Sequence, residues 1–356
     1  MKVGIALSGG VDSASAAIDL MNEGYEVTAY HMKTIPDETF KIFPEKTKVC
    51  CSPSDTLDAM KIADILGIEL KIIDIKNFFE KNIINYFVEE YLVGRTPNPC
   101  VVCNDVVKFG KLMNTALEDG MDMFSSGHYA KIINSDAFGY VILRGKSKQK
   151  DQSYFLSRIK KHKLERIMFP NGAKTKQEIR KLAEQSNLPI HRKEESQEIC
   201  FIPDNDYRRF LNDRNIKPKA GNIVDENGKI LGKHKGLPFY TIGQRKGLGI
   251  TSVEKLYVIE FDYENNLIIV GPREKTMNKH FTINHLNWFV DEPQKLELKC
   301  MIRSSMSAVP CEIKVLTEKT EIIFEEPASA ITPGQLAVLY HKEYVIGSGF
   351  ISEIIE

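Results

Sequence analysis

The chain has 356 residues, and its 48 lysines and arginines equal its 48 aspartates and glutamates in number. This length exceeds one ordinary domain and predicts two or three, whereas the balanced charge argues against a uniformly basic nucleic-acid coat. Seven cysteines without an apolar leader segment argue against a secreted disulfide framework, and no apolar run is long enough to cross a membrane. We therefore expect a cytoplasmic protein with no membrane partner.

Short apolar runs alternate with longer periodic segments over the first 127 residues. Ser52 or Ser54 is the expected N-terminal cap of a helix predicted at 54–66, which should end at Gly67. Alternating strands and helices are typical of a parallel sheet with helices on both faces, so the N-terminal domain is predicted to be α/β. The runs predict strands at 2–7, 27–32, 70–75 and 121–127, and the segments between them predict helices at 13–23, 54–66, 77–93 and 104–119.

The pattern changes in the second half of the chain. A further helix is predicted from 175 to 188, and hairpin turns are expected at 227–228 and 265–266. After about residue 212, β-branched and aromatic runs predict strands within 222–231, 237–243, 255–271, 296–302, 309–316, 321–326 and 335–351. The predicted domains are an α/β domain at 1–212, a small β-rich domain at 213–280 and a C-terminal barrel or sandwich at 281–356.

The first predicted strand ends in SGGVDS, residues 8–13, and runs directly into a helix. Glycines let backbone N–H groups turn toward one point, and a helix N-terminus carries partial positive charge, so this loop suits an anion such as pyrophosphate. It lacks the GK[ST] ending of a Walker A loop and does not fit GxGxxG. A plain glycine turn before a helix is the alternative interpretation.

The segment from Arg144 to Lys163 carries eight lysines or arginines against the single acid Asp151, with Tyr154 and Phe155 among them. Basic residues interleaved with aromatic ones are typical of a nucleic-acid contact. A solvated surface face is the alternative, because exposed lysines are common in any globular protein.

Several motifs, in this order along nearly the whole chain, resemble one family. They are SGGVDS at 8–13, RTPNPCVVCN at 95–104, SGHYA at 126–130, KDQSYFL at 150–156, ICFI at 199–202, YTIGQRKGLG at 240–249 and TPGQ at 332–335. SGGVDS resembles the loop of the PP-loop ATP pyrophosphatase superfamily, and the full set resembles the tRNA-uridine 2-sulfurtransferases. The resemblance implies that the C2 oxygen of the wobble uridine of a tRNA is activated with AMP from ATP and replaced by sulfur, with release of AMP and pyrophosphate.

The resemblance also implies an ATP site at the carboxyl ends of the strands, which is where ligands bind in open parallel sheets. Mg²⁺ is expected to accompany the phosphates. The implied ATP-site residues are Ala6, Leu7, Ser8, Gly9, Gly10, Val11, Asp12, Ser13, Met32 and Gly127.

A tRNA anticodon arm is the implied macromolecular substrate, and a cysteine desulfurase or a sulfur-relay protein is the implied sulfur donor. Ser304 stands where many relatives carry an aromatic residue, so stacking on a base is in doubt there. The implied tRNA contacts are Asn98, Pro99, Cys100, His128, Lys150, Asp151, Gln152, Arg303, Ser304 and Gln335.

Two sulfur chemistries stay open for the cysteines. In the family, the residue at Cys200 carries a persulfide and the residue at Cys103 attacks it, which leaves a disulfide between them. Most relatives read NPD where this chain reads NPC, so Cys100 adds a third thiol that favours a [4Fe–4S] cluster held by Cys100, Cys103 and Cys200. Cys50, Cys51, Cys300 and Cys311 are interpreted as structural.

Two other classes of function compete with this interpretation. A PP-loop enzyme that adenylates a small molecule would use SGGVDS but not the KDQSYFL and GQRKGLG motifs. A non-catalytic RNA-binding protein with a redox or metal centre would use the basic segment and the cysteines but not the phosphate loop.

Overall fold

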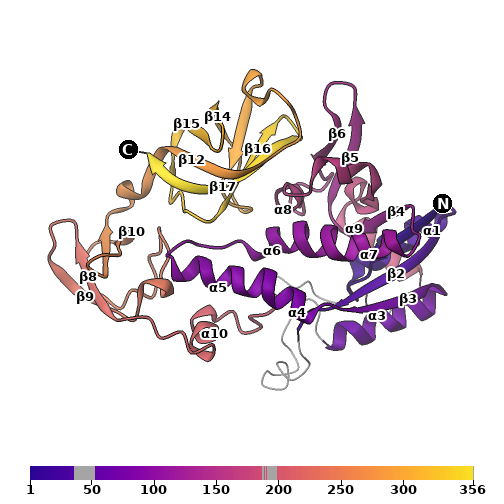
Figure 1. The fold of residues 1–356 in the computed structure, drawn as a ribbon, viewed down its shortest axis with the longest axis horizontal. Helices are drawn as coiled ribbons and strands as arrows, with labels where there is room; N and C mark the ends of the chain where they lie inside the picture. The colour runs from indigo at the N-terminus through magenta and orange to yellow at the C-terminus, as the bar shows by residue number, and fades with distance from the viewer. Residues whose placement is uncertain (36–52, 187, 189, 191–198, 356) are drawn as a thin grey trace. The chain divides into compact units, whose positions relative to one another are not determined.

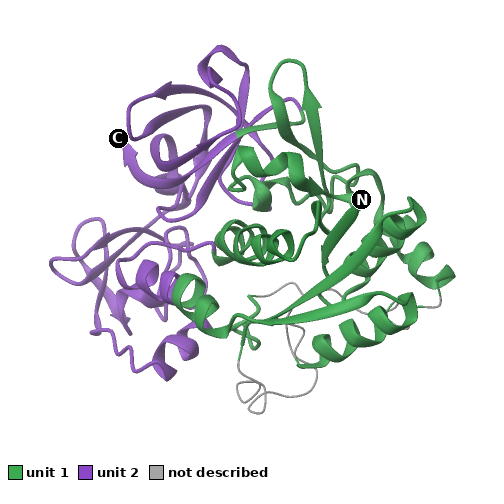
Figure 2. Ribbon diagram, turned by 45° about the vertical axis from the view of Figure 1, so that its right-hand side comes forward, with its two compact units in different colours: residues 1–84, 99–206, 343–346 green, residues 85–98, 207–342, 347–356 purple. Residues whose placement is uncertain are grey.

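The computed structural model describes residues 1–35, 53–186, 188, 190 and 199–355. Cys50, Cys51 and Ser52 lie outside these residues. The chain divides into two compact units, which Figure 2 shows in different colours. Unit 1 contains 1–84, 99–206 and 343–346, and unit 2 contains 85–98, 207–342 and 347–356.

Unit 1 is built on a five-stranded sheet with the order β3-β2-β1-β4-β7, in which every neighbouring pair is parallel (Figure 1). The predicted α/β class is therefore confirmed. The sheet strands are β1 (Lys2–Ala6), β2 (Glu26–Lys33), β3 (Glu69–Asp74), β4 (Met123–Ser126) and β7 (Ile167–Met168). An antiparallel hairpin outside this sheet, β5 (Ala130–Ser135) and β6 (Gly139–Arg144), pairs through Leu143 with Tyr344 and was not predicted.

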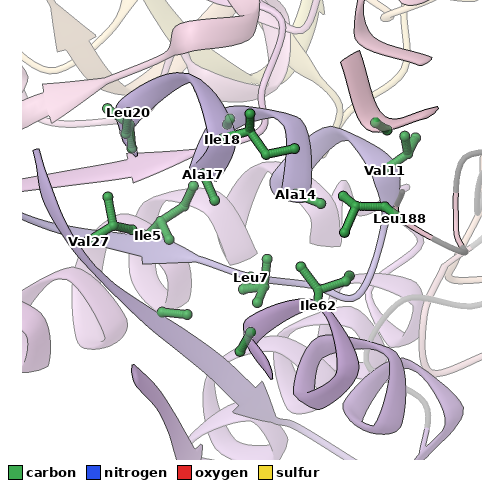
Figure 3. Packing of buried hydrophobic residues seen from close by; sticks show 14 of the residues in the cluster. Ile5, Leu7, Val11, Ala14, Ala17, Ile18, Leu20, Val27, Ile62 and Leu188 are labelled. Atoms are coloured by element: carbon green, nitrogen blue, oxygen red, sulfur yellow. The ribbon is translucent and has the colours of Figure 1, made fainter. Parts of the chain in front are cut away.

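Helices cover both faces of this sheet. Val3 and Ile5 of β1, with Leu7 directly after it, point into one core cluster together with side chains of α1 (Val11–Asn22), α3 (Pro53–Leu66) and α9 (Lys176–Gln185), part of which Figure 3 shows. Gly4, which alternates with them, faces the other side, where an added Cβ would lie 3.0 Å from Ala116 of α7 (Met113–Glu118). Period-two alternation along a buried strand explains this division.

The predicted helix 104–119 differs most from the structure. It begins earlier, as α6 (Pro99–Val102), runs as a π-helical segment η2 (Cys103–Leu112) and ends as α7. Cys100 and Cys103 therefore lie on helical backbone and not in a loop. Proline suits the first turn of a helix because its missing N–H has no partner there, which explains a start at Pro99.

The remaining helical segments of unit 1 are mostly short. The expected cap at Ser54 is wrong, because Ser54 lies inside α3, whereas the predicted end of that helix at Gly67 is confirmed. The other segments are α4 (Lys76–Phe79), η1 (Glu80–Ile84), α8 (Ser153–Leu156), η3 (Lys161–Arg166) and η4 (Pro170–Ala173).

Unit 2 combines two helices, a small sheet and a barrel. The helices are α5 (Asn85–Leu92) and α10 (Tyr207–Asp213), and the sheet has the order β10-β11-β8-β9. Both predicted hairpin turns are confirmed, although β8 and β11 pair in parallel. The predicted strand 237–243 is wrong, because η5 (Leu237–Phe239) forms a 3₁₀ turn there and residues 240–243 form no strand. The strands are β8 (Gly221–Asp225), β9 (Ile230–His234), β10 (Tyr257–Asp262) and β11 (Leu267–Gly271).

The C-terminal strands close into an antiparallel barrel, because β12 pairs with both β15 and β17. The barrel strands are β12 (Met277–Trp288), β13 (Leu298–Met301), β14 (Val309–Val315), β15 (Thr320–Ser329), β16 (Leu336–His341) and β17 (Tyr344–Ile355). Two short 3₁₀ segments, η6 (Arg273–Thr276) and η7 (Pro293–Lys295), flank β12. Closure leaves no open sheet edge in this part of the fold.

Candidate nucleotide and sulfur-transfer site

The loop Ser8–Gly10 connects β1 to α1 at the carboxyl edge of the parallel sheet. The Ser13 hydroxyl accepts from the Ser8 backbone N–H at 3.2 Å and donates to the Gly10 carbonyl at 3.0 Å. Gly9 has φ of +77°, and an added Cβ would lie 2.3 Å from the carbonyl oxygen of Asp55. Only glycine fits this conformation and approach, so the sequence of the loop is matched to its tight geometry.

A pocket opens beside this loop. Seven of the ten predicted ATP-site residues line it, namely Ala6, Leu7, Ser8, Asp12, Ser13, Met32 and Gly127. Gly9, Gly10 and Val11 do not line it: Gly9 and Gly10 belong to the turn, and Val11 is the first residue of α1. Two residues predicted to contact tRNA, His128 and Gln152, also line this pocket. Tyr30, His31, Lys108, Leu112 and Ser126 line it as well and were not singled out from the sequence. The carboxyl-terminal parts of β2 and β4 could have indicated Tyr30, His31 and Ser126, whereas Lys108 and Leu112 come from η2.

Gly127 lies where β4 ends against the first turn of α1. An added Cβ there would lie 2.5 Å from the carbonyl carbon of Asp12 and 2.6 Å from the backbone nitrogen of Ser13. The buried side-chain amide of Asn171 donates to the carbonyl oxygens of both Asp12, at 2.8 Å, and Gly127, at 3.0 Å. These contacts fix the start of the helix against the end of the strand.

The carboxylate of Asp12 is held from one side. It accepts a short hydrogen bond from the hydroxyl of Tyr129. It also forms an ion pair with Lys176, whose Nζ lies 2.8 Å and 3.0 Å from the two carboxylate oxygens. Neither Tyr129 nor Lys176 was identified from the sequence. The loop therefore presents a fixed carboxylate whose charge is balanced by a lysine.

Two histidines line the pocket as neutral rings. Burial lowers the pKa of His31, whose Nδ1 donates to the carbonyl of Leu7 at 2.8 Å and whose Nε2 lies 3.0 Å from the Thr56 hydroxyl. Burial, with the nearby Lys108 charge, lowers the pKa of His128 well below its ordinary value. A pocket that disfavours charged imidazole at neutral pH offers hydrogen-bonding rings instead of cations.

The three cysteines of the sulfur hypothesis lie in unit 1. Cys100 is exposed on α6, Cys103 is half-buried at the start of η2, and Cys200 is half-buried next to Phe201, which packs on Phe79. Lys108 and Leu112, on the same π-helical segment as Cys103, reach the pocket. The helix that carries one candidate nucleophile thus also forms a wall of the pocket.

The buried cysteines of the barrel behave differently. Burial raises the pKa of Cys311 to about 12 and that of Cys300 well above its ordinary value. Since the thiolate is the reactive form, these two thiols are kept unreactive.

The basic segment is partly built into the fold. Arg158 is buried, and the Nζ of Lys163 donates to the carbonyl of Phe109. The Asp151 carboxylate accepts from the backbone of Gly145 and from Ser153, and the Gln152 side chain accepts from the backbone N–H of Tyr129. Asp151 and Gln152 therefore shape the turn that carries Lys150, whose backbone donates to Ser147.

The remaining predicted tRNA contacts lie in or next to unit 2. Gln335 donates through its side chain to the carbonyl oxygens of Thr96, at 3.0 Å, and Pro97, at 3.2 Å, so it holds the backbone that leads to Asn98 and Pro99. The guanidinium of Arg303 donates to the carbonyl oxygen of Ala330 at 2.9 Å, and Ser304 is exposed.

The residues present can hold Mg²⁺ but not the expected [4Fe–4S] cluster. In phosphate sites Mg²⁺ needs only one or two carboxylates besides the phosphates, and Asp12 supplies one at the pocket, so the residues fit. A cluster on three thiolates needs its cysteines gathered in one group. Across the described residues, no group of three or more His, Cys, Asp or Glu side chains able to hold a metal is formed. Cys100, Cys103 and Cys200 therefore do not fit the cluster.

The fold and the pocket define an α/β protein with a glycine-containing loop and a pocket at the carboxyl edge of a parallel sheet, which is where folds of this class bind their ligands. Comparison with known proteins is more specific. Three family models match, described as tRNA methyl transferase HUP domain over 1–204, tRNA methyl transferase PRC-barrel domain over 208–272 and aminomethyltransferase beta-barrel domain over 278–351.

Curated relatives match from end to end. The tRNA-specific 2-thiouridylase MnmA of Fervidobacterium nodosum is 48% identical over 98% of this chain and 99% of its own length, and that of Pseudothermotoga lettingae is 45% identical over 100% of both. The chain belongs to the tRNA-specific 2-thiouridylase family. Among solved structures, the similarity to a 4-thiouridine synthetase–RNA complex with bound ATP is low, at 13% identity and a TM-score of 0.37 over 60% of this chain and 50% of that chain. Among the described residues, no helix is both long and apolar enough to cross a membrane.

Proposed function

We propose that this protein replaces the C2 oxygen of the wobble uridine of tRNA with sulfur, at the expense of ATP. The observation that carries the proposal is the pocket beside Ser8–Gly10, in a chain 48% identical over its length to a 2-thiouridylase. The C2 oxygen is a poor leaving group, and transfer of AMP onto it, with release of pyrophosphate, converts it into a good one. An anion-binding loop at the helix N-terminus suits the phosphates.

The ATP would lie with its phosphates on the loop 8–13 and its adenosine near Met32 and Gly127. Ala6 and Leu7 line the pocket and Val11 begins the helix after the loop, and the Asp12 carboxylate would hold Mg²⁺ together with the phosphates. When bound, Mg²⁺ supplies positive charge to the pyrophosphate leaving group. The neutral His128 and the side chain of Gln152 line the same pocket, and we propose that they contact the activated base.

Sulfur delivery is proposed to use two cysteines. A persulfide on Cys200, formed by transfer from a cysteine desulfurase or a sulfur-relay protein, is attacked at Sγ of Cys200 by the Cys103 thiolate. The Cys200–sulfur bond breaks, a Cys103–Cys200 disulfide forms, and the released hydrosulfide attacks C2 while AMP leaves with the original oxygen. An external thiol then reduces the disulfide. The half-buried positions of Cys103 and Cys200 are compatible with access by a donor.

The tRNA would be bound through its anticodon arm, with the target base splayed out, as sequence-specific RNA recognition commonly requires. Lys150, on a turn shaped by Asp151 and Gln152, is proposed to contact the phosphate backbone. Asn98, Pro99 and Cys100 are proposed to line the base pocket, and Gln335 to hold the segment before them. Arg303 and Ser304 are proposed as further contacts.

Methyl transfer is the second candidate, because two of the matching family models are described as tRNA methyl transferase domains. The deciding experiment incubates the protein with an unmodified tRNA transcript, ATP, Mg²⁺ and sulfide, followed by mass spectrometry of the digested nucleosides. We expect 2-thiouridine only when ATP is present. Methylated uridine formed with a methyl donor, and no thiouridine, would overturn the proposal.

The same reaction mixture separates the other classes of function. AMP formation that does not depend on tRNA would indicate an enzyme that adenylates a small molecule, and tRNA binding without any ATP turnover would indicate a non-catalytic binding protein.

A further inference from the structure

Two lysines of one short segment form ion pairs with the same helix. Lys174 pairs with Asp19, and Lys176 pairs with Asp12, both acids being on α1. The two pairs join the same parts of the fold, namely the start of α9 with the residues before it and the helix that follows the phosphate loop. The two pairs differ in position: Asp12 lines the pocket, whereas neither Asp19 nor Lys174 does.

The pair at the pocket is well defined. Only 15% of the Lys176 side chain and 29% of the Asp12 side chain are exposed. The Nζ of Lys176 contacts both carboxylate oxygens and lies 5.8 Å from the ring centre of Tyr129, whose hydroxyl also donates to Asp12. Partial burial strengthens such charge-assisted bonds relative to those in water.

The backbone holds Lys176 in place independently of this pair. Lys176 is the first residue of α9, whose N-cap Thr175 forms a capping box with Glu178. The exposed Glu178 carboxylate accepts from the Thr175 backbone and from Lys146, and these bonds lower its pKa to about 2. The position from which the lysine reaches Asp12 is therefore set before any ligand arrives.

The ion pair between Lys176 and Asp12 also changes the charge that a bound phosphate meets at the loop. A triphosphate brings several negative charges to a loop that already carries the Asp12 carboxylate, which is more than one Mg²⁺ balances, and like charges a few ångströms apart repel strongly where water is partly excluded. We propose that Lys176 is a positioning residue of the phosphate site, which balances the charge of Asp12 and orients its carboxylate so that the loop accepts an anionic phosphate chain. The inference rests on the proposed function in taking ATP as the ligand.

The test compares Lys176→Gln with Lys174→Gln, its matched control. Each variant loses one ion pair to α1, so both should show a similar small decrease in melting temperature. Binding of a non-hydrolysable ATP analogue with Mg²⁺ is measured by calorimetry. We expect Lys176→Gln to weaken the affinity by about 10- to 100-fold, the range for a lost charged hydrogen bond, whereas Lys174→Gln and Lys176→Arg bind nearly as the unaltered protein does.

A double variant tests whether Lys176 acts through Asp12. When Asp12→Asn has removed the carboxylate, the lysine has no charge to balance, so adding Lys176→Gln should cost much less affinity than it does alone. Equal costs in both backgrounds would overturn the proposed route through Asp12.

The outcomes separate this inference from the proposed function. If the unaltered protein binds the ATP analogue and Lys176→Gln binds it equally well, the role of Lys176 is refuted while the ATP site stands. If Lys174→Gln weakens binding as much as Lys176→Gln, the lysines only stabilise the fold and the inference falls. If the unaltered protein binds no ATP analogue, the proposed function falls and this inference with it.

Discussion

Gly127 and Asp12, which are 115 residues apart in the sequence, are in direct backbone contact at the pocket: a Cβ on Gly127 would lie 2.5 Å from the carbonyl carbon of Asp12. Real Cβ atoms do not approach backbone this closely, and the neighbour here is the first turn of a buried helix. The end of β4 and the start of α1 can hold this distance only with glycine at position 127.

Gly127→Ala is therefore expected to displace the first turn of α1. We predict a loss of about 1–3 kcal/mol in the free energy of unfolding, typical of overpacking, together with weaker ATP binding. Gly24→Ala is the control, since no heavy atom lies within 4 Å of its added Cβ and only its φ of +84° is strained. The control should lose stability in urea titrations but keep its ATP affinity. Unchanged ATP affinity in Gly127→Ala would contradict this account of the pocket.

The histidines of the pocket predict a pH dependence of stability. The pKa of His128, and that of His31, is lowered in the folded protein, mainly by burial, below the ordinary value of 6.5. Between the lowered pKa values and 6.5, the unfolded chain therefore binds more protons than the folded one. The free energy of unfolding falls as the pH drops through about 6.5.

His128→Gln should make this decline shallower, and a change of the exposed His162 to Gln should leave it unaltered. Urea unfolding between about pH 7.5 and about pH 5, which spans the ordinary histidine pKa of about 6.5, measures both. A decline that is equally steep in His128→Gln and in the unaltered protein would refute the assignment to this ring.

Lys150 is predicted to contact a phosphate of the tRNA. Lys150→Glu should weaken tRNA binding and reduce the slope of log affinity against log salt by about one unit, because one counterion-releasing contact is lost. Lys2→Glu is the control, because Lys2 lies at the amino end of β1, away from the pocket at the carboxyl end. Filter binding over a range of salt concentrations gives the slopes. Equal slopes for Lys150→Glu and Lys2→Glu would mean that the basic segment is a solvated surface.

The cysteine variants separate the two sulfur chemistries. With a cysteine desulfurase and cysteine as the persulfide donor in place of sulfide, Cys103→Ser and Cys200→Ser should be inactive in thiolation, whereas Cys100→Asp, which restores the commoner family motif, should stay active with no bound iron. One turnover without reductant should also trap a Cys103–Cys200 disulfide, detectable by peptide mass spectrometry. Anaerobically purified protein that carries iron and sulfide, and that loses both iron and activity in Cys100→Asp, would contradict the two-cysteine route.

The strands and helices of unit 1 could be predicted from the sequence because their hydrophobic periodicity is strong. The loop 8–13 could be predicted because its glycines and the helix that follows identify it locally. The sequence could not predict the π-helical form of 103–112, since the local pattern there is that of an ordinary helix. It also missed the β5–β6 hairpin, which lies between two motifs interpreted only through the resemblance. Lys176 was missed for a different reason, since its partner Asp12 is 164 residues away and only the folded chain brings them together.

The central claim, that AMP is transferred to the C2 oxygen before sulfur replaces it, is tested most directly by following that oxygen atom. A tRNA whose target uridine carries a heavy oxygen isotope at C2 is incubated with the protein, ATP, Mg²⁺ and sulfide, and the AMP is analysed by mass spectrometry. We predict one labelled AMP for each 2-thiouridine formed. Label recovered in water, with unlabelled AMP, would contradict the adenylation of the C2 oxygen.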